Sequence, residues 1–557
     1  MNGTQVRRRL RTLARLRGIQ LSYTGYDGRT VRASDDTLAA VLEALGHPVP
    51  NAAAIDEQLR LAEAEQPDAD EAPKALRRPA PRTTPRARRR GLGVSAPLYA
   101  LRGADDWGVG SFRDLAAFAD LARGWGAELI GTLPLFAMWT DPPIDPSPYL
   151  PVSRLFWNEL YVDVAGAAEL AGCPPPVELR PAAPVQRAPD VDYEAVADAK
   201  RRALDACATA MRTADGRRRE SFEQFVAGHP ELGPYADFRA GGDEHCAHYH
   251  RFVQYAASTQ IADAAARGDR VGVGLYLDLP AGVHPHGYDT WANPGLFADA
   301  QVGAPPDALA EGGQAWGFPP LHPQRLRDSG YRYFIETLRV AMRHARAVRL
   351  DHILGLQRLY WIPSGLDATA GAYVRYRHDE LLAIVAAEAR CAGTTVIGED
   401  LGTVSPEIRR AMDRHDILHT FVSRFEASAG DPLPQPSRPS AASLGSHDLP
   451  RFATFWADPD QRELVEALGV SDPHAALRAC LESLAAGPAA YLFADLADLE
   501  GETVPDNRPG TGVEAANWRH RLPRTIRALA HDGALRELMT GLCALRATAT
   551  TKEATSP

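Results

Sequence analysis

The sequence predicts an α/β protein built around a parallel sheet, which is either closed into a barrel or doubly wound. The chain has 557 residues, 45% of them hydrophobic, which is enough for a large core. From residue 91 onward, short apolar or β-branched runs alternate with helical patterns over roughly 400 residues. A strand, a helix and a further strand in succession place the two strands parallel to each other.

The first segment, residues 1–65, is expected to form a small helical module. Apolar residues recur at helical spacing in Val6–Leu16 and Ile55–Ala64, and Ser34 supplies the cap of a helix between them. Residues 66–90 are rich in Pro, Arg and Ala and are predicted to be a linker. A solvated tether explains the arginines of this linker better than an anion-binding patch does.

Residues 91–546 are predicted to form the α/β part, followed by a flexible tail at 547–557. Strands are expected at Leu129–Phe136, Leu160–Val164, Val271–Leu279, Val348–Ile353, Thr394–Leu401, His419–Phe425 and Ala441–Leu444. Helices are expected at Ser111–Ala122, Arg332–Ala345, roughly Ala370–Ala392, Pro406–Arg414 and Gln461–Leu468. The stretch between Val164 and Val271 is too long for one crossover, so a helical insertion is predicted at about 165–270.

Composition and charge exclude several classes of protein. A net charge of −10 argues against a general nucleic-acid binder, which needs a basic face. Six cysteines without a C-x-x-C spacing indicate free thiols and a cytoplasmic location rather than a disulfide framework. The sequence has no apolar run of about 18 residues and no apolar signal region, so neither a membrane span nor secretion is expected.

Two acidic residues follow neighbouring predicted strands. Asp351 lies near the end of Val348–Ile353, and Glu399 lies near the end of Thr394–Leu401. Because these strands are expected to be parallel, both carboxylates emerge at the same edge of the sheet, where α/β barrels place their chemistry. Two carboxylates a few Å apart on neighbouring strand ends are the groups needed to break a glycosidic bond.

The neighbours of these two acids suit different roles. Side chains alternate along a strand, so Arg349 points the same way as Asp351 and favours the ionised carboxylate that a nucleophile requires. An ordinary strand-end ion pair explains Arg349 and Asp351 equally well. Glu399 lies between Gly398 and Gly402 in partly apolar surroundings that suit a general acid. Taken alone, a turn that begins a helix is the simpler explanation of Glu399.

Further polar and aromatic residues lie at expected strand ends and in a loop. His447 and Asp448 could bind sugar hydroxyls, although a helix-capping turn is the simpler explanation; the consecutive Ser-His-Asp cannot form a hydrolytic triad. Asp278 ends another strand and is either a substrate contact or a partner of another side chain. Trp316 lies in a loop rich in Gly and Pro and either closes over a sugar face or packs in the core.

Neither a metal nor an organic cofactor is expected. His245, His248 and His250 offer ligand-type side chains, but no second cluster at a familiar spacing completes a tetrahedral set. No phosphate-binding GxxxxGK[ST] motif is present, and no glycine fingerprint of a dinucleotide site follows a strand.

Several short motifs occur in order along the chain. They are Ser147-Pro-Tyr149, Gly303-Ala-Pro-Pro-Asp307, Gln314-Ala-Trp-Gly317, Arg349-Leu-Asp-His352 with Gly355, Gly398-Glu-Asp-Leu-Gly402, the pair His447-Asp448, and Pro509-Gly-Thr511 with Asn517-Trp-Arg519. Together they resemble the amylomaltases, the 4-α-glucanotransferases of glycoside hydrolase family 77. The resemblance covers roughly residues 91–545, and residues 1–65 resemble the helical start of bacterial members that use maltodextrin.

The resemblance implies a (β/α)8 TIM barrel with helical insertion subdomains, preceded by the small N-terminal helical module. It implies a retaining transfer of an α-1,4-glucan segment to the 4-OH of glucose or a maltodextrin, without a cofactor. By position, Asp351 is the nucleophile, Glu399 the acid/base and Asp448 a third acid that binds the −1 sugar. The other side chains expected around the substrate are Arg349, His447, Ser147, Tyr149, Asp278, Asp307, Trp316 and His352.

The chain also departs from the family pattern. Ser446 and Leu449 replace the usual threonine and asparagine around the His-Asp pair, Ala315 replaces a more polar residue, and Ala308 and Leu309 replace aromatic residues of some members. The β-rich domain usual in long bacterial members gives way to the linker 66–90. Donor length, acceptor preference and oligomeric state stay open. An α-glucan hydrolase, a transferase with a modified acceptor and a non-catalytic glycan-binding protein are the alternative functions.

Overall fold

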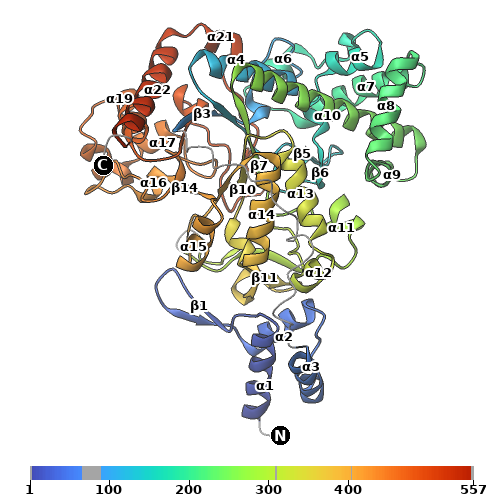
Figure 1. Cartoon of the computed structure of the whole chain (residues 1–557), viewed down its shortest axis with the longest axis vertical. Coiled ribbons are helices and arrows are strands. Elements are labelled where there is room, and N and C mark those ends of the chain that lie inside the picture. Colours follow the sequence, from blue (N-terminus) through green and yellow to red (C-terminus); the bar gives the residue numbers. More distant parts are fainter. Residues whose placement is uncertain (1–2, 66–89, 308–309, 403, 513, 554–557) are drawn as a thin grey trace.

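The computed structural model describes residues 3–65, 90–307, 310–402, 404–512 and 514–553. Eight parallel strands form a closed barrel, which confirms the predicted α/β barrel (Figure 1). The barrel strands are β3 (Gly91–Ser95), β4 (Leu129–Gly131), β7 (Gly274–Leu279), β10 (Ala347–Leu350), β13 (Thr395–Gly398), β14 (Leu418–Val422), β15 (Ser440–Ser443) and β16 (Tyr491–Asp495). Each pairs with the next in chain order, and β16 closes the barrel onto β3.

Helices surround the barrel and extend from it. Those of the barrel part are α4 (Phe112–Gly124), α11 (Tyr288–Ala292), α12 (Pro323–Asp328), α13 (Arg332–Met342), α14 (His378–Ala392), α15 (Pro406–Arg414), α16 (Ser423–Glu426), α17 (Phe452–Ala457), α18 (Arg462–Ala467), α19 (Pro473–Ala486), α20 (Leu496–Leu499), α21 (Ile526–Ala530) and α22 (Gly533–Glu553). The bounds of α15 are those expected from the sequence, because Ser405 caps its first turn and Pro406 follows the cap.

Two barrel strands, β3 and β16, were absent from the sequence prediction. β3 contains Gly91 and Gly93, and glycine is unfavourable in strands when it is judged by propensity. In the barrel a Cβ atom on Gly93 would lie 2.3 Å from the ring of Phe493, and one on Gly91 would lie 2.8 Å from the ring of Tyr491. The glycines therefore make room for two aromatic rings of β16, a reason that the local sequence does not reveal.

The predicted strand Leu160–Val164 was wrong. Residues Glu159–Tyr161 form a 3₁₀ turn and Val164 begins α5 (Val164–Ala171), because Asn158 and Asp163 cap these two elements. The strand of this region is β6 (Ser153–Trp157), which pairs antiparallel with β5 (Phe136–Ala137). The helices between residues 164 and 271 are α5, α6 (Ala183–Arg187), α7 (Tyr193–Met211), α8 (Gly216–Gly228), α9 (Leu232–Ala240) and α10 (Glu244–Val271).

A second sheet lies beside the barrel and has the strand order β12-β11-β8-β9. Its strands are β8 (Ala300–Ala304), β9 (Gln314–Ala315), β11 (Arg358–Pro363) and β12 (Ala372–Arg375). The helix expected from roughly Ala370 begins only at His378, because the residues before it form β12. β8 pairs with β11 across a long separation in the chain, so the local spacing of apolar residues could not reveal this pairing.

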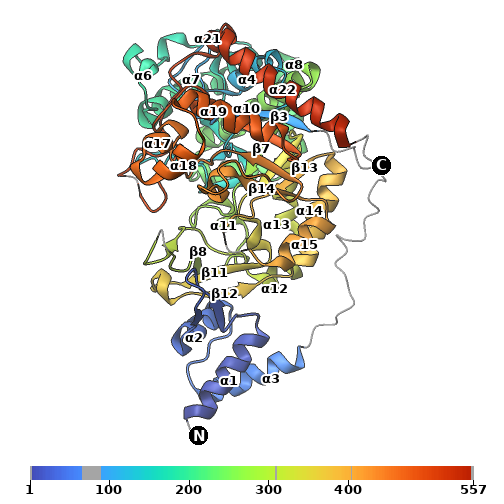
Figure 2. The ribbon, with the colours of Figure 1, turned by 90° about the vertical axis from the view of Figure 1, so that its left-hand side faces the viewer.

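The N-terminal segment packs on this second sheet, at the end of the molecule shown at the bottom of Figures 1 and 2. It contains α1 (Gly3–Leu16), α2 (Asp35–Ala44) and α3 (Ala52–Ala64), and also an unexpected hairpin of β1 (Ser22–Thr24) and β2 (Thr30–Arg32). Its apolar core includes Trp361 and Val374 of the sheet. The Gln20 amide donates to the Tyr373 carbonyl (2.8 Å), so backbone bonds join the segment to β12.

Other expectations concern the linker, the tail and the cysteines. The predicted linker 66–90 lies outside the described residues except for Arg90. The segment 547–557, expected to be a flexible tail, begins as the last turns of α22, and residues 554–557 lie outside the described residues. All six cysteines are free. Over the described ranges, no helix combines the length and the apolar character needed to cross a membrane.

Candidate active site

The two predicted acids lie side by side at the carboxyl end of the barrel. β10 and β13 are paired with Leu350 opposite Gly398, so Asp351 and Glu399 each follow directly at the ends of adjacent strands. Gly398 makes room for the side chain of Ile353 there, because a Cβ atom would lie 2.6 Å from it. The structure thus brings together the two carboxylates that the sequence predicts to meet.

Two backbone amides hold the Glu399 carboxylate. The His352 amide donates to Oε2 (3.0 Å) and the Leu401 amide donates to Oε1 (2.8 Å). His352 has a positive φ of 45°, a left-handed conformation that is uncommon for residues other than glycine and turns the chain sharply after β10. Within the described ranges one amide contacts each carboxylate oxygen, so each oxygen keeps a lone pair for a substrate.

Asp351 is oriented by an arginine. Arg349 Nη1 lies 2.9 Å from Asp351 Oδ1, and the same nitrogen lies 2.9 Å from both carboxylate oxygens of Asp278. The Ala281 amide approaches Asp351 Oδ2 at 3.4 Å. Burial alone would lower the pKa of Arg349, but the two carboxylates hold it well above its usual value. The sequence left open whether Asp278 contacts the substrate or supports another side chain. Its bonds to Arg349 favour the second role.

Aromatic rings and a third acid complete this end of the barrel. The Tyr149 hydroxyl donates to Asp278 Oδ2 (2.7 Å), and its ring stacks on His447 with 4.9 Å between centroids. His447 Nε2 lies 3.3 Å from Asp448 Oδ2. Trp518 flanks both rings, 5.5 Å from Tyr149 and 5.6 Å from His447. The predicted residues Tyr149, His447 and Asp448 therefore form one connected group with Arg349 and Asp278.

The protonation of the His447–Asp448 pair follows from its surroundings. Burial acts to raise the pKa of Asp448, but the charge of His447 and hydrogen bonds from His447 and Asn507 hold it well below its usual value. Burial acts to lower the pKa of His447, but Asp448 raises it above 6.5. Asp448 is therefore a carboxylate at neutral pH and can accept hydrogen bonds from sugar hydroxyls.

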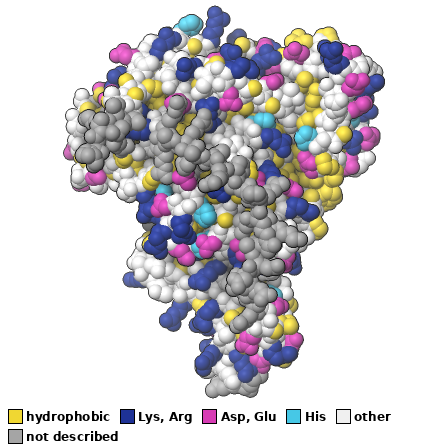
Figure 3. All heavy atoms as spheres, viewed as in Figure 1, with side chains coloured by type: hydrophobic (Ala, Val, Ile, Leu, Met, Phe, Trp, Pro, Cys, Tyr) yellow, Lys and Arg dark blue, Asp and Glu magenta, His cyan; other side chains and the backbone are white. Residues whose placement is uncertain are grey.

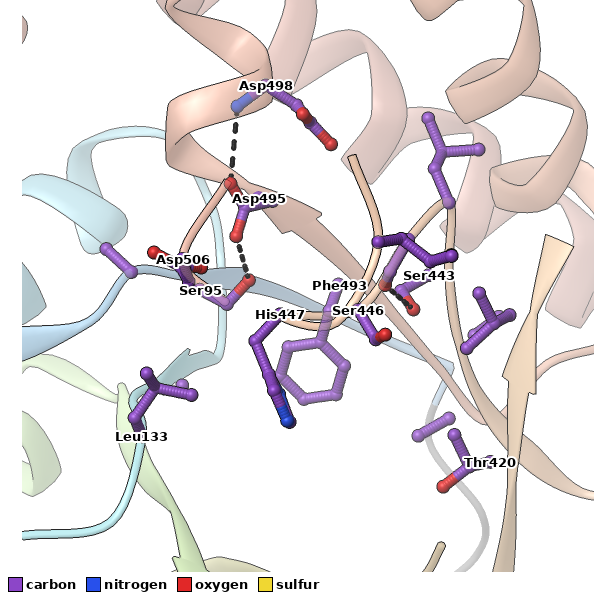
Figure 4. Close-up of a pocket in the computed structure, with 18 of the residues that line it drawn as sticks. Ser95, Leu133, Thr420, Ser443, Ser446, His447, Phe493, Asp495, Asp498 and Asp506 are labelled. Atoms are coloured by element: carbon purple, nitrogen blue, oxygen red, sulfur yellow. Dashed lines mark hydrogen bonds between the residues drawn. The ribbon is translucent and has the colours of Figure 1, made fainter. Parts of the chain in front are cut away.

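A cavity of about 150 Å³ opens beside these residues (Figure 4). Figure 4 shows the His447 ring pointing into it, with Ser443, Ser446 and Thr420 around the opening. The replacement of threonine by Ser446 keeps a hydroxyl here, and Ser446 Oγ accepts a bond from the Asp448 amide (3.3 Å). This contact shapes the turn that carries His447 and Asp448.

The remaining predicted residues lie at the edges of the site. Trp316 packs edge-on against the His352 ring, with 5.0 Å between centroids. Asp307 accepts a bond from the Ala310 amide in the neighbouring loop, whose residues 308–309 lie outside the described ones. Ser147 accepts a bond from the Tyr149 amide (3.4 Å), so it shapes the turn before that residue. Direct substrate contacts of these residues, and of the other predicted site residues, stay predictions.

Asn507 is a site residue that the sequence analysis missed. Its side-chain amide donates to Asp448 Oδ1 (2.6 Å), and its backbone amide donates to the His447 carbonyl (3.1 Å). The only sequence signal was its place in a polar loop just before the Pro509-Gly-Thr511 motif. The contact itself joins residues 59 positions apart.

Replacing Asn507 with Ala is expected to lower kcat/KM for maltotriose by roughly 10-fold, because the charged Asp448 carboxylate loses the hydrogen bond that the Asn507 amide donates to it. Steady-state kinetics on the variant and the wild type measure the loss. An unchanged kcat/KM would show that Asn507 does not act on Asp448.

His419, a buried residue of β14, links Asp400, the residue after Glu399, to helix α15. His419 Nδ1 lies 2.8 Å from Asp400 Oδ2 and its Nε2 lies 3.1 Å from Asp413 Oδ1. Asp400 also accepts a hydrogen bond from the Thr420 amide (3.0 Å), so it is bound to β14 as well. Burial acts to lower the pKa of His419, but the two carboxylates raise it above 6.5.

The raised pKa of His419 gives a testable dependence of stability on pH. The charged histidine stabilises the fold fully below pH 6.5, and this contribution is lost as the pH rises through its folded-state pKa. We expect His419→Gln to lower the free energy of unfolding by about 2 kcal/mol in mildly acidic buffer, with a smaller difference from the wild type in alkaline buffer. Urea unfolding at several pH values measures this difference, and a difference that is constant with pH would contradict the prediction.

The residues named above as possible metal ligands diverge. His245 Nε2 lies 2.9 Å from Asp205, His248 Nε2 lies 2.8 Å from the Ala208 carbonyl, and His250 lies 3.5 Å from Glu159. Across the part of the chain that the structure describes, no group of three or more His, Cys, Asp or Glu side chains is arranged to hold a metal ion.

Comparisons with known proteins agree on one family. The family model described as 4-alpha-glucanotransferase, glycoside hydrolase family 77, matches residues 96–247 and 242–526. The 4-alpha-glucanotransferase of Mycobacterium tuberculosis is 34% identical over 519 residues, covering 78% of this chain and 71% of the relative. That of Haemophilus influenzae is 31% identical over 434 residues, covering 68% and 62%.

Solved structures lead to the same group. The amylomaltase of Corynebacterium glutamicum superposes with a TM-score of 0.83 at 27% identity, covering 96% of this chain and 99% of that one. The amylomaltase of Streptococcus agalactiae, solved in complex with acarbose, has a TM-score of 0.73 at 18% identity and covers 82% and 99%, which supports the fold alone.

Proposed function

The chain belongs to the 4-alpha-glucanotransferases of glycoside hydrolase family 77, and from this premise we propose that Asp351 and Glu399 perform its glucan transfer by a retaining double displacement. The enzyme transfers a segment of an α-1,4-glucan to the 4-OH of a glucose or maltodextrin acceptor. One observation supports this assignment above others: the two carboxylates follow paired residues of adjacent strands at the carboxyl end of the barrel.

In the first step, Asp351 attacks the anomeric carbon while Glu399 donates a proton to the glycosidic oxygen. The bond to the leaving glucan breaks, and a β-glycosyl ester forms on Asp351. Arg349 lies 2.9 Å from Asp351 Oδ1 and the Ala281 amide lies 3.4 Å from Oδ2, so the carboxylate is fixed and Oδ2, which has the longer contact, attacks. Asp448, a carboxylate at neutral pH, accepts hydrogen bonds from the ring hydroxyls of the same sugar and stabilises its distorted transition state.

In the second step, Glu399 takes the proton from the 4-OH of the acceptor, whose oxygen attacks the anomeric carbon. The ester on Asp351 breaks and an α-1,4 bond forms, so two inversions give net retention. Retaining chemistry calls for carboxyl groups about 5–5.5 Å apart. Transfer exceeds hydrolysis only if an acceptor sugar is held next to Glu399 better than water is.

The surroundings of the protein in the cell are part of the proposal. Six free cysteines suit a reducing compartment, and we place the enzyme in the cytoplasm on that ground.

On the described parts of the face in Figure 3, basic and acidic side chains are interspersed instead of forming one basic stripe. A neutral glucan, in contrast to a nucleic acid, needs no such stripe.

Incubation of the purified protein with maltotriose, followed by chromatography of the products, tests the function. A transferase yields glucose together with maltodextrins longer than maltotriose. Reducing sugars without longer products would indicate a hydrolase instead. Binding of maltotriose without turnover would indicate a glycan-binding protein.

A further inference from the structure

We propose that the N-terminal hairpin forms the outer wall of the acceptor cleft and that Tyr26, at its tip, stacks on a sugar of a long acceptor. The hairpin consists of β1, β2 and the turn Gly25–Arg29. The inference rests on the proposed function, since it takes Glu399 as the group that faces the acceptor. It gives the N-terminal segment a role in choosing between short and long maltodextrins.

A cleft of about 310 Å³ separates the hairpin from the barrel end. One wall is the hairpin, with Thr24, Gly25 and Tyr26. The opposite walls are Gly303–Asp307 of β8 and its loop, Trp316, His352, the strand β11 with Arg358 and Tyr360, and the segment after β13 with Leu401, Gly402 and Ser405. In Figure 1 the hairpin rises from α2 toward α15, whose cap is Ser405. The cleft is therefore bounded jointly by the N-terminal segment and the catalytic loops.

The cleft begins beside Glu399, at the two residues whose amides bind its carboxylate. His352 and Leu401, whose amides hold the two oxygens of Glu399, both line it. Trp316 packs against the His352 ring on the same side. A sugar bound next to Glu399 thus has its continuation in this cleft, and a glucan that extends away from the scissile bond arrives at the hairpin.

The base of the hairpin is held firmly on the second sheet. The Tyr23 ring makes edge-to-face contacts with Tyr360 at 5.9 Å and with Tyr373 at 5.4 Å. The Gln20 side chain accepts a bond from Arg358 (3.0 Å), and the Gln20 backbone bonds to Tyr373. Since β8, which carries the opposite wall, belongs to the same sheet, the distance across the cleft is set by that sheet.

The tip of the hairpin presents an aromatic ring to the cleft. Two hydrogen bonds close the turn. The Gly25 amide donates to the Arg29 carbonyl (2.8 Å), and the Arg29 amide donates to the Asp27 carboxylate (2.9 Å). Tyr26 lies in this turn and is 63% exposed, although it lines the cleft. An exposed ring beside a polar cleft offers a flat apolar face for the C–H side of a sugar, with polar groups around it for the hydroxyls.

Polar side chains on the other walls suit sugar hydroxyls. Gln357 lines the cleft, accepts a bond from Ser405 Oγ (2.9 Å) and donates to Glu407 (3.0 Å). Arg358 lies over the Tyr373 ring at 4.2 Å and contributes donors to the same wall. The ligand class is thus an uncharged polyhydroxylated chain, and the inference requires that a single glucose held at Glu399 does not reach Tyr26.

The test compares two acceptors at a fixed concentration of an activated donor, α-maltosyl fluoride. For Tyr26→Ala we expect the acceptor KM for maltopentaose to rise roughly 5-fold, with kcat and the KM for glucose within about twofold of the wild type. Tyr26→Phe keeps the ring and should behave like the wild type. Val31→Ala is the matched control, because Val31 is a 40% exposed apolar residue of the same hairpin that does not line the cleft.

The outcomes separate this inference from the proposed function. A wild type that makes longer products from maltotriose, together with a Tyr26→Ala variant whose KM for maltopentaose is unchanged, overturns the inference alone. A KM that rises equally for glucose and maltopentaose also overturns it, since the effect would then be general. A wild type without any transfer overturns the proposed function and the inference with it. Equal unfolding midpoints of the variants and the wild type exclude a folding defect.

Discussion

Asp351→Asn is expected to lower kcat for the disproportionation of maltotriose by roughly 10,000-fold or more. The amide cannot form the glycosyl ester, so the double displacement has no first step. KM should change little, because the Asn side chain keeps the shape of the site and Arg349 keeps its partner Asp278 at 2.9 Å. Steady-state kinetics with chromatographic detection of glucose and longer maltodextrins measure the loss.

A matched control for Asp351→Asn is Asp120→Asn. Asp120 lies on α4 and pairs with Arg267 at 2.9 Å on the outside of the protein, so its loss should leave kcat within about twofold of the wild type. Calorimetric binding of maltotriose to both variants checks that the substrate site survives. Near-normal turnover by Asp351→Asn would remove that residue from the role of nucleophile.

Glu399→Gln is expected to lower kcat for maltotriose by about 100- to 10,000-fold, because neither proton transfer is assisted any longer. α-Maltosyl fluoride needs little acid assistance, since fluoride is a good leaving group. With this donor the variant should form the glycosyl ester and then stall, because no base activates the acceptor. Mass spectrometry of digested protein should find the added sugars on the peptide that contains Asp351.

Azide gives a second readout for Glu399→Gln. A nucleophile that needs no base attacks the ester from the face opposite Asp351, so azide should restore turnover and yield α-maltosyl azide. The wild type should form little of this product, because its acid/base already activates sugar acceptors. A variant that stays active on maltotriose, or an adduct on another peptide, would refute the paired roles of Glu399 and Asp351.

The meeting of Asp351 and Glu399 at one end of the barrel could be predicted from the sequence because its signals are local. The β-branched runs around Asp351 and Glu399 predict strands, and the helix between them predicts parallel neighbours. Parallel neighbouring strands place both acids at the same edge of the sheet, independently of the arrangement of the other strands. The bounds of α15 and the Ser34 cap of α2 were predictable for a similar reason, since a cap bonds to a residue three positions away.

Several parts of the site had no comparable signal. Asn507 holds Asp448 across 59 positions, and Tyr149 meets His447 across 298 positions. The hairpin around Tyr26 is short and exposed, and the sheet that supports it was not predicted either. In each case the role depends on a partner from a remote segment, and neither spacing nor propensity encodes which partner that is.

The sequence by itself determined the α/β class, the order of most barrel strands and the two acids at their ends, because strand and helix patterns repeat over a few residues. Only the tertiary structure decided that β3 and β16 close the barrel, since the glycines of β3 make room for Tyr491 and Phe493 of β16. It also decided that the N-terminal segment reaches the cleft, through its bonds to β12. Barrel closure and docking are contacts between remote segments, and their free energy depends on the packing of side chains that meet only in the folded chain.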